Sequence, residues 1–503
     1  MKVCLINPPM LRPRRGDVDV CQPLGLAYLA AVLKEWSGYD VAIVDALGLA
    51  WKRVNRWDED RLYLGLSYGE LFKEIEKFRP DMVGISIPFS TQSSSAYRLM
   101  RLLKDNLPDV VTVVGGPHAS VRPMECLSHG ADFAVIGEGE QTICELARKI
   151  EDGDENFYDV KGIAFKRRGT ELETTATRPP ISDLSILPFP ARYLLPMENY
   201  FEAAKERYAT MITSRGCPYR CFFCSIHSTM GRLWRPRSPQ NVVDEIEHLI
   251  EEYQIRKIYF EDDNISLDRE RMARICDLII KRGLNIRWDL RNGVRADRLN
   301  EELLSKMKNA GCKRLCVAPE SGDQQVVDKI VRKNLDLVDV EKAVRLSHKA
   351  GIIVDAFFVV GLVGEDKTTM RRSLDFAHKL RMEGLRHSFF FIAQPYYGTD
   401  LYANAKEKGY LMKDGMNLEL GILDGEALIK TPQLAPEDVT SSRLEALKEE
   451  ARDYLNPRYL FSQVHGLLHS KREIVSLASS FFSSYFQRKT LAETAEDVRS
   501  QGS

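Results

Sequence analysis

The sequence predicts an α/β protein with an N-terminal flavodoxin-like doubly wound parallel sheet, a partial (β/α)6 barrel behind it and a helical C-terminal region. Short β-rich apolar runs alternate with helical patterns over the first 150 residues, and the alternation restarts near residue 206 after a proline-rich break. The chain has 503 residues, which is too many for one ordinary core. We expect four regions, which are 1–150, 151–205, 206–410 and 411–503.

The first region contains five candidate strands, each followed by a helical stretch. This alternation is typical of a parallel sheet that is covered on both faces, and five strands fit a flavodoxin-like domain. The candidate strands are Val3–Asn7, Val41–Asp45, Met82–Ile87, Val111–Gly115 and Phe133–Ile136.

The second region differs from the third by its high proline content. Pro179, Pro180, Pro188 and Pro190 interrupt helix and strand alike, so we expect a linker with one small hairpin around Val160–Phe165. Six further βα units then suggest an open or closed barrel, with the chemistry at the carboxyl ends of the strands. The candidate strands are Ala209–Thr213, Lys257–Phe260, Ile286–Leu290, Arg314–Val317, Val354–Val359 and Ser388–Ile392.

The last region reads as helical over Pro436–Tyr454 and Tyr459–Phe486. The second stretch is rich in apolar residues, which favours an amphipathic helix packed on the barrel. A surface that shields a hydrophobic substrate or touches a membrane is the alternative.

Charge and hydropathy limit the partners. Lys plus Arg is 71 and Asp plus Glu is 72, so the net charge gives no global reason to expect a nucleic acid partner. No window of 18 uncharged apolar residues exists, and the N-terminus lacks a signal peptide's long apolar stretch. We therefore expect a cytoplasmic protein without a transmembrane segment.

Three of the ten cysteines are clustered, and the other seven are scattered in the manner of free core thiols. Cys217, Cys221 and Cys224 are spaced C-x3-C-x2-C in a loop after the first strand of the barrel. A structural zinc site normally needs four ligands, and no nearby Cys or His pair completes one. Three thiolates suit a 4Fe–4S cluster with one iron left open for a chelating ligand.

The segment Thr213–Cys224 resembles the cluster loop of the radical S-adenosylmethionine (SAM) enzymes. The resemblance implies that Cys217, Cys221 and Cys224 hold the cluster and that the amino and carboxylate groups of SAM occupy the open iron. It also implies that Phe223 packs on the adenine of SAM.

Further matches to the same family follow along the barrel. The resemblance implies that Asp262 and Asp263 meet the SAM ammonium, although Asp also serves as a helix N-cap. It also implies that Glu320, in a Glu-Ser-Gly turn, binds the ribose or the methionine end. The other SAM-binding candidates are Arg291, for which a solvated loop position is the alternative, together with Ser321, Gly361 and Gly364.

Two glycine-rich turns of the first region resemble the cobalamin-binding domain that precedes many radical SAM barrels. They contain Gly115 with Gly116 and Gly137 with Gly139, and Ser90 lies at the same expected edge of the sheet. None of the nine histidines has an Asp two residues before it, so we expect no histidine ligand to cobalt and a structural role for His118. A vestigial domain without a corrinoid is the alternative.

Together these motifs resemble the cobalamin-dependent radical SAM enzymes, in particular the group of magnesium-protoporphyrin monomethyl ester oxidative cyclases and radical SAM C-methyltransferases. The resemblance implies cleavage of SAM to a 5′-deoxyadenosyl radical and methylation of an unactivated carbon of a small molecule, for which a hydrophobic compound is one option. It also implies an external electron donor of the flavodoxin or ferredoxin type. The alternatives are an oxidative cyclase or carbon–carbon bond-forming enzyme with a tetrapyrrole or lipid substrate, and a non-catalytic sensor. The sequence assigns no catalytic acid, base or radical quencher.

Overall fold

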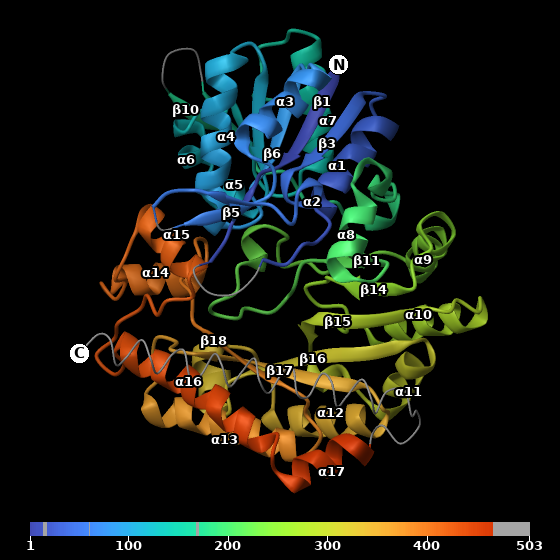
Figure 1. Ribbon diagram of the computed structural model, residues 1–503, viewed down its shortest axis with the longest axis vertical. Helices are drawn as coiled ribbons and strands as arrows, with labels where there is room; N and C mark the ends of the chain where they lie inside the picture. Colours follow the sequence, from blue (N-terminus) through green and yellow to red (C-terminus); the bar gives the residue numbers. More distant parts are fainter. Residues whose placement is uncertain (14–17, 60, 167–170, 466–503) are drawn as a thin grey trace.

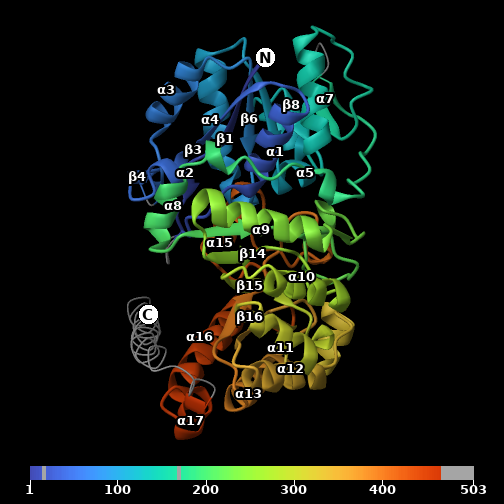
Figure 2. The ribbon, with the colours of Figure 1, turned by 90° about the vertical axis from the view of Figure 1, so that its right-hand side faces the viewer.

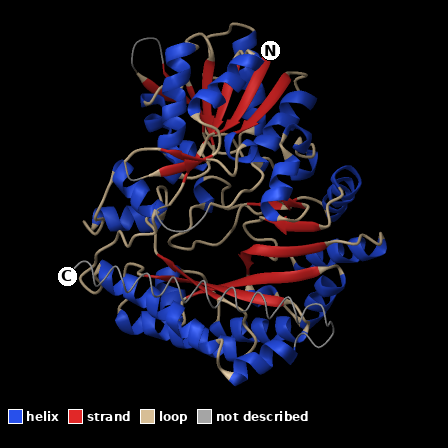
Figure 3. Ribbon diagram, viewed as in Figure 1, coloured by secondary structure: helices blue, strands red, loops and turns tan. Residues whose placement is uncertain are grey.

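Two parallel sheets form the framework of the molecule, one above the other in Figure 1. The computed structural model describes residues 1–13, 18–59, 61–166 and 171–465. The first sheet and its helices occupy the top of Figure 1, and the second sheet lies below with α16 (Pro436–Asp453) and α17 (Pro457–His465) at the bottom. Figure 3 shows the two sheets in red.

The first sheet has the strand order β10-β9-β8-β7-β6-β1-β3. Its five parallel strands, numbered along the chain, lie in the order 2-1-3-4-5, which is the flavodoxin-like arrangement that the sequence predicts. These strands are β1 (Lys2–Asn7), β3 (Asp40–Asp45), β6 (Met82–Ser86), β7 (Val111–Gly115) and β8 (Phe133–Val135).

Helices cover both faces of this sheet because successive strand residues point to opposite sides. Val3 and Leu5 of β1 pack in one apolar core with α1 (Leu24–Glu35) and α7 (Glu140–Glu151). Cys4 and Ile6 pack in a second core with α3 (Tyr68–Phe78) and α4 (Ser93–Asn106).

The small hairpin expected around Val160–Phe165 is formed by β9 (Ile163–Lys166) and β10 (Leu172–Thr174), and it extends the first sheet by two antiparallel strands. The structure also adds strands that the sequence pattern did not indicate. A small antiparallel sheet is formed by β2 (Met10–Leu11), β5 (Leu62–Leu64) and β4 (Val54–Arg56). These added strands have two or three residues and are too short for a periodicity argument.

The second sheet is a partial barrel of six parallel strands in chain order, with β11 and β18 at its two edges. This is the open (β/α)6 arrangement predicted from the sequence. Its strands are β11 (Tyr208–Met211), β14 (Lys257–Phe260), β15 (Arg287–Val294), β16 (Cys312–Glu320), β17 (Ile353–Val360) and β18 (Ser388–Ile392). The connecting helices are α9 (Pro239–Tyr253), α10 (Arg269–Lys281), α11 (Glu301–Asn309), α12 (Leu337–Lys349) and α13 (Lys367–Met382). Figure 2 shows these helices along the outside of the barrel.

The C-terminal part of the described chain covers the edge of the barrel. Helix α16 packs on β18 and α13, with Val439 and Ala446 in the same core as Phe358 and Phe390. The predicted helix Tyr459–Phe486 begins within α17, and its part beyond residue 465 lies outside the described residues. No helix of the described chain combines the length and the apolarity needed to cross a bilayer.

Candidate active site

The loop with the three clustered cysteines is fixed over the carboxyl ends of the barrel strands. Phe222, between the second and third cysteines, donates its backbone N–H to Val331 O (3.0 Å) and accepts from Leu401 N (3.0 Å). Its ring is buried with the same two residues. Val331 follows β16 and Leu401 follows β18, so the loop reaches across the barrel mouth.

Gly216 allows the chain to enter this loop. Its φ is +82°, and a Cβ there would lie 2.3 Å from Leu233 O. Only glycine fits both the conformation and the space. The preceding pair Ser214–Arg215 forms β12, which is antiparallel to β13 (Arg235–Pro236). The loop is therefore anchored on both sides of the cysteines.

Cys217, Cys221 and Cys224 line one cavity of about 690 Å³. Burial raises the pKa of Cys221 and raises that of Cys224 to about 12. Thiolates in such surroundings need a positive ion beside them, and three sulfur donors with no fourth cysteine in the lining suit a 4Fe–4S cluster with one open iron. The donor set fits the expected cluster.

The same cavity offers polar groups that have no partner among the described residues. The side-chain oxygens Asn264 Oδ1 and Gln394 Oε1 are buried and accept no hydrogen bond there, and both residues line the cavity. A buried acceptor without a donor costs about 1–3 kcal/mol. The residues that line this cavity therefore leave hydrogen-bond acceptors unused among the described groups.

Four of the predicted SAM-binding residues line this cavity, namely Phe223, Asp263, Arg291 and Glu320. Asp263 accepts a hydrogen bond from Gly216 N (3.0 Å), which connects the acidic motif to the cluster loop. Glu320 has φ +67°, a conformation that costs a non-glycine residue about 1–3 kcal/mol.

Glu320 also forms a buried ion pair with Lys333, whose Nζ lies 2.5 Å from Glu320 Oε1. The Arg291 guanidinium lies over the ring of Tyr259, 3.3 Å from its centroid. The charged walls of the cavity are therefore held in place by their neighbours.

The other four predicted SAM-binding residues do not line the cavity. Asp262 is buried and accepts hydrogen bonds from Thr213 Oγ1 (2.8 Å) and Ser214 Oγ (2.6 Å), because neighbouring residues at a strand end point in opposite directions. Ser321 Oγ lies 3.0 Å from Ser373 Oγ, on the helix side of the barrel.

Gly361 and Gly364 have positive φ values and face apolar side chains. A Cβ on Gly361 would lie 2.7 Å from Val439, and one on Gly364 would lie 3.2 Å from Ile330. These two glycines satisfy close packing against α16 and the segment after β16.

The predicted cobalamin edge lies at the carboxyl ends of the first sheet, as a doubly wound domain requires. Gly115 ends β7, and Gly116 has φ +101° with Ile87 O 2.9 Å from its Cβ position. Gly137 has φ +82°, donates its N–H to Ser120 Oγ (3.0 Å) and has Thr229 O of the barrel domain 4.0 Å from its Cβ position. Gly139 directly precedes α7.

His118 and Ser90 are bonded to each other at this edge. The Nδ1 atom of His118 lies 2.9 Å from Ser90 Oγ, and its Nε2 atom lies 2.8 Å from the hydroxyl of Tyr97. The His118 side chain is buried, and burial lowers its pKa to about 4. Both ring nitrogens are engaged within the protein, which fits the structural role expected of this histidine.

A buried ionic network, which the sequence pattern does not predict, joins the two domains. Arg215 Nη2 lies 2.6 Å from Glu140 Oε1, and Arg215 Nη1 lies 3.1 Å from Glu138 Oε1. Arg235 Nη1 lies 2.8 Å from Glu138 Oε1. The two carboxylates flank Gly139 of the predicted cobalamin turn, and the two arginines flank the cluster loop. Their spacing along the chain carries no signal of this pairing.

Family models match both domains. A B12 binding domain is found over residues 18–147 and a radical SAM superfamily domain over residues 211–377. The cytidylyl-2-hydroxyethylphosphonate methyltransferase of Streptomyces wedmorensis is 31% identical over 474 residues, which cover 85% of this chain and 88% of the relative. This chain belongs to the B12-binding radical SAM enzymes.

Two further relatives of the enzyme extend over nearly its whole length. An uncharacterized methyltransferase of Pyrococcus horikoshii is 30% identical and covers 96% of the enzyme and 99% of its own length. The anaerobic magnesium-protoporphyrin IX monomethyl ester cyclase of Rubrivivax gelatinosus is 27% identical and covers 97% and 84%.

Solved structures share the fold of the enzyme. The cobalamin-dependent SAM radical enzyme OxsB with aqua-cobalamin bound superposes with a TM-score of 0.70 at 18% identity, over 97% of the enzyme and 72% of OxsB. The radical SAM methyltransferase TsrM of Kitasatospora setae, with cobalamin and a [4Fe-4S] cluster bound, gives 0.66 at 19%, over 82% and 79%. The cofactors of the enzyme are a 4Fe–4S cluster, SAM and cobalamin.

Proposed function

We propose that this enzyme is a C-methyltransferase that methylates an unactivated carbon of a small molecule bound in the cavity beside Cys217, Cys221 and Cys224. When bound, the cluster and SAM supply a 5′-deoxyadenosyl radical and cobalamin supplies the methyl group. The reductant is an external one-electron donor of the flavodoxin or ferredoxin type.

In this proposal the residues of the chain bind and orient the reacting groups. The three cysteines hold the cluster. Asp263 and the unpartnered Asn264 Oδ1 face the SAM ammonium, and Glu320 faces the ribose or the methionine end. The roles of Phe223 and Arg291 are to pack on the adenine and to bind the carboxylate of SAM.

The first sheet contributes the second half of the site. We infer that Ser90, Gly115, Gly116, Gly137 and Gly139 present a backbone edge to the corrin and its nucleotide tail. Glycines let a flat macrocycle approach the main chain closely. No histidine is available as a cobalt ligand in this proposal, because both nitrogens of His118 are already hydrogen-bonded.

One observation carries the proposal. Glu138 and Glu140 beside the predicted cobalamin turn are ion-paired with Arg215 and Arg235 beside the cluster loop. This buried connection joins the predicted cobalamin edge to the cluster loop across the domain boundary, so the two face each other. A methyltransferase that uses both cofactors on one substrate requires that arrangement. The whole-length methyltransferase relatives support the same conclusion.

The test uses the anaerobically purified, reconstituted enzyme with a reductant and SAM labelled in its methyl group. We expect 5′-deoxyadenosine to form, and label to appear in the product once extracts of the source cells supply the substrate. The matched control is Cys221→Ala, in which cluster absorbance and 5′-deoxyadenosine should both be lost. Cleavage of SAM that persists in this variant would exclude the cysteine assignment.

An oxidative cyclase is the second candidate. The relative from Rubrivivax gelatinosus covers 97% of the enzyme and is a cyclase, and Phe357, Phe391 and Tyr396 give the cavity an aromatic wall suited to a flat substrate. The same experiment separates the two candidates, because a cyclase forms 5′-deoxyadenosine and product without incorporating label. The non-catalytic sensor is not supported, because the chain belongs to a family of enzymes.

A further inference from the structure

The C-terminal region, whose role the sequence leaves open, supplies one wall of the cavity at the cluster. Ile422, Gly425 and Arg443 line it together with the cysteines. Ile422 lies on α15 (Gly415–Leu423) and Arg443 on α16, so this wall comes from outside the barrel. The residue that stands out on it is Arg443.

Arg443 is half-buried and has no hydrogen bond or ion pair with any residue that the structure describes. Its guanidinium lies beside the backbone, with Nη1 3.6 Å from the Cβ position of Gly425. The acidic residues on either side of Gly425 are engaged elsewhere. Asp424 pairs with Arg61 (2.9 Å), and Glu426 pairs with Lys413. Neither of these acidic residues therefore pairs with Arg443, and its positive charge remains available in the cavity.

The other cations of the cavity are engaged by the protein. Lys333 pairs with Glu320, and Arg295 pairs with Asp297 (2.9 Å) and donates to the carbonyl oxygen of Lys333 (2.8 Å). Arg291 is stacked on a tyrosine ring. Arg443 differs from Lys333 and Arg295 because no described group satisfies its five N–H donors. It differs from Arg291 because no described aromatic ring is stacked on its guanidinium.

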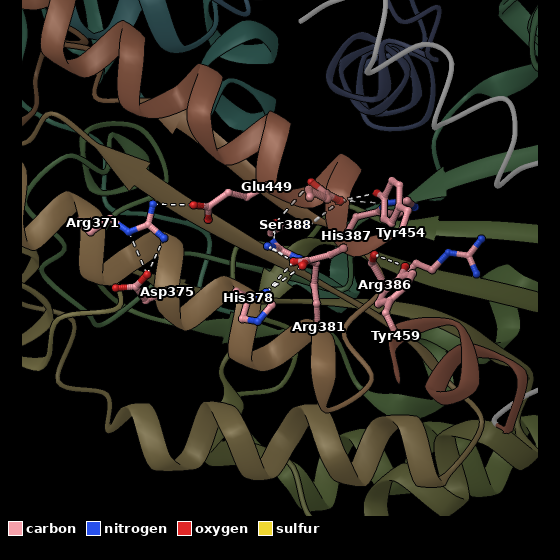
Figure 4. A network of polar contacts seen from close by, with 12 residues as sticks. Arg371, Asp375, His378, Arg381, Arg386, His387, Ser388, Glu449, Tyr454 and Tyr459 are labelled. Carbon is pink, nitrogen blue, oxygen red and sulfur yellow. Dashed lines mark hydrogen bonds and ion pairs between the residues drawn. The ribbon is translucent and has the colours of Figure 1, made fainter. Parts of the chain in front are cut away.

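Helix α16 holds Arg443 firmly. Figure 4 shows the polar network that ties this helix to α13 and β18. Glu449 lies 2.5 Å from Arg371 Nη1, and Tyr454, which follows the helix, lies 2.6 Å from His387 Nδ1. Buried Arg381 donates to Asp453 (2.6 Å). The backbone that carries Arg443 is therefore fixed, and its planar guanidinium loses less freedom per hydrogen bond than a lysine ammonium would.

Two aromatic side chains of the same cavity are unusually accessible. Phe391 is 49% exposed and Tyr396 is 41% exposed, although both line the cavity with Arg443. Large apolar side chains that remain open inside a cavity are typical of a ligand site. The combination of an unpaired guanidinium and open rings indicates an organic anion with an apolar body.

We propose that Arg443 binds the anionic head group of the substrate, a phosphonate, phosphate or carboxylate, while Phe391 and Tyr396 pack on its apolar part. Guanidinium groups match these anions through two parallel N–H bonds. The inference rests on the proposed function, since it takes the cavity at the cysteines as the substrate site. It assigns substrate selection to the C-terminal region.

The experiment measures binding of three probes to the reconstituted enzyme with a reduced cluster and a SAM analogue that the cluster does not cleave. The probes are 4-fluorophenylphosphonate, 4-fluorophenylacetate and the uncharged 4-fluorophenylacetamide. The unpaired electron of the reduced cluster enhances ¹⁹F relaxation only for probes bound near the cysteines, so the readout reports this cavity. The variants are Arg443→Met and Arg443→Lys, and the matched control is Arg452→Met, which changes an exposed arginine of the same helix.

We expect at least one anion to bind the wild-type enzyme about 10- to 100-fold more tightly than the amide, as one charge-assisted contact implies. Arg443→Met should remove this preference, Arg443→Lys should keep part of it, and Arg452→Met should change nothing. Whether phosphonate or carboxylate binds better identifies the head group, and either result supports the proposal. Equal binding of the amide, unchanged anion binding in Arg443→Met, or weaker SAM binding in that variant would overturn it.

Parallel samples that contain SAM are assayed for 5′-deoxyadenosine, which keeps the two proposals distinguishable. SAM cleavage without Arg443-dependent anion binding refutes this inference alone. Arg443-dependent binding without SAM cleavage refutes the proposed function alone.

Discussion

The ionic connection between the domains makes a strong prediction about Glu140. Glu140 and Arg215 are 4% and 7% exposed, and their charged atoms lie 2.6 Å apart. In Glu140→Gln the side chain keeps its size, and Arg215 loses one of its two carboxylates. Breaking a buried pair costs about 3–5 kcal/mol. Because Glu138 still faces Arg215 at 3.1 Å, we expect the lower end of that range.

The cost should appear as an earlier unfolding transition. A loss of about 3 kcal/mol lowers the midpoint by about 6–12 °C for a cooperative unit of 150–250 residues. Scanning calorimetry of the anaerobic protein measures it. The matched control is Glu145→Gln on the same helix, which removes an ion pair with Arg178. The side chain of Glu145 is 48% exposed in this pair. A surface pair of this kind contributes less than about 1 kcal/mol.

The pH dependence gives a second check with a defined sign. Burial by itself raises the pKa of Glu140, but the charge of Arg215 outweighs it and the net pKa is lowered. The stabilisation is therefore present above the ordinary Glu pKa of about 4.3 and is lost as the pH falls through the lowered value. The difference between wild type and Glu140→Gln should shrink below about pH 4. An unfolding midpoint of Glu140→Gln within 2 °C of wild type would refute the reasoning, because such a shift corresponds to less than about 1 kcal/mol. An equally large fall of the midpoint in Glu145→Gln would refute it as well.

Three further substitutions test other parts of the fold. Burial raises the pKa of Glu365 to about 8, so the free energy of unfolding of the wild type should fall by up to about 2 kcal/mol from pH 6 to pH 8. Urea unfolding should show a smaller fall in Glu365→Gln. Parallel curves of unfolding free energy against pH for the two proteins would contradict the assignment. Gly116→Ala should lower the unfolding free energy by about 1–3 kcal/mol because of its positive φ and the nearby carbonyl, whereas Gly25→Ala, in open space on α1, should be neutral or stabilising. Gly216→Ala should displace the cluster loop and reduce the iron bound per chain; full iron content in this variant would show that the loop tolerates a Cβ.

The fold could be predicted from the sequence because local patterns encode it. Alternating apolar runs mark the strands, and the right-handed βα connection leaves few ways to order them. Thus Lys257–Phe260 and Ser388–Ile392 are strands with the predicted bounds. The three cysteines that we expect to hold the cluster form an equally local signal, since they lie within eight residues of the chain.

The remainder of the site depends on direction and on long-range pairing, which the sequence does not encode. Asp262 and Asp263 look equivalent in the chain, yet one is bonded beneath the loop and the other lines the cavity. Arg443 belongs to a helix that the sequence predicts, but only the packing of α16 on β18 turns its side chain toward the cysteines.

The connection from Glu138 and Glu140 to Arg215 also affects the distance between the cluster loop and the predicted cobalamin edge. Arg215 stands two residues before Cys217, and Glu138 accepts an additional bond from Ile181 N (2.7 Å) in the connecting segment. The predicted cobalamin edge, the connecting segment and the cluster loop therefore meet at one carboxylate. The spacing between cluster and cobalamin edge is then set by buried charges rather than by the length of a linker. The proposed C-methyltransferase, in which a substrate radical must meet a methyl donor before it meets solvent, requires a fixed geometry of this kind.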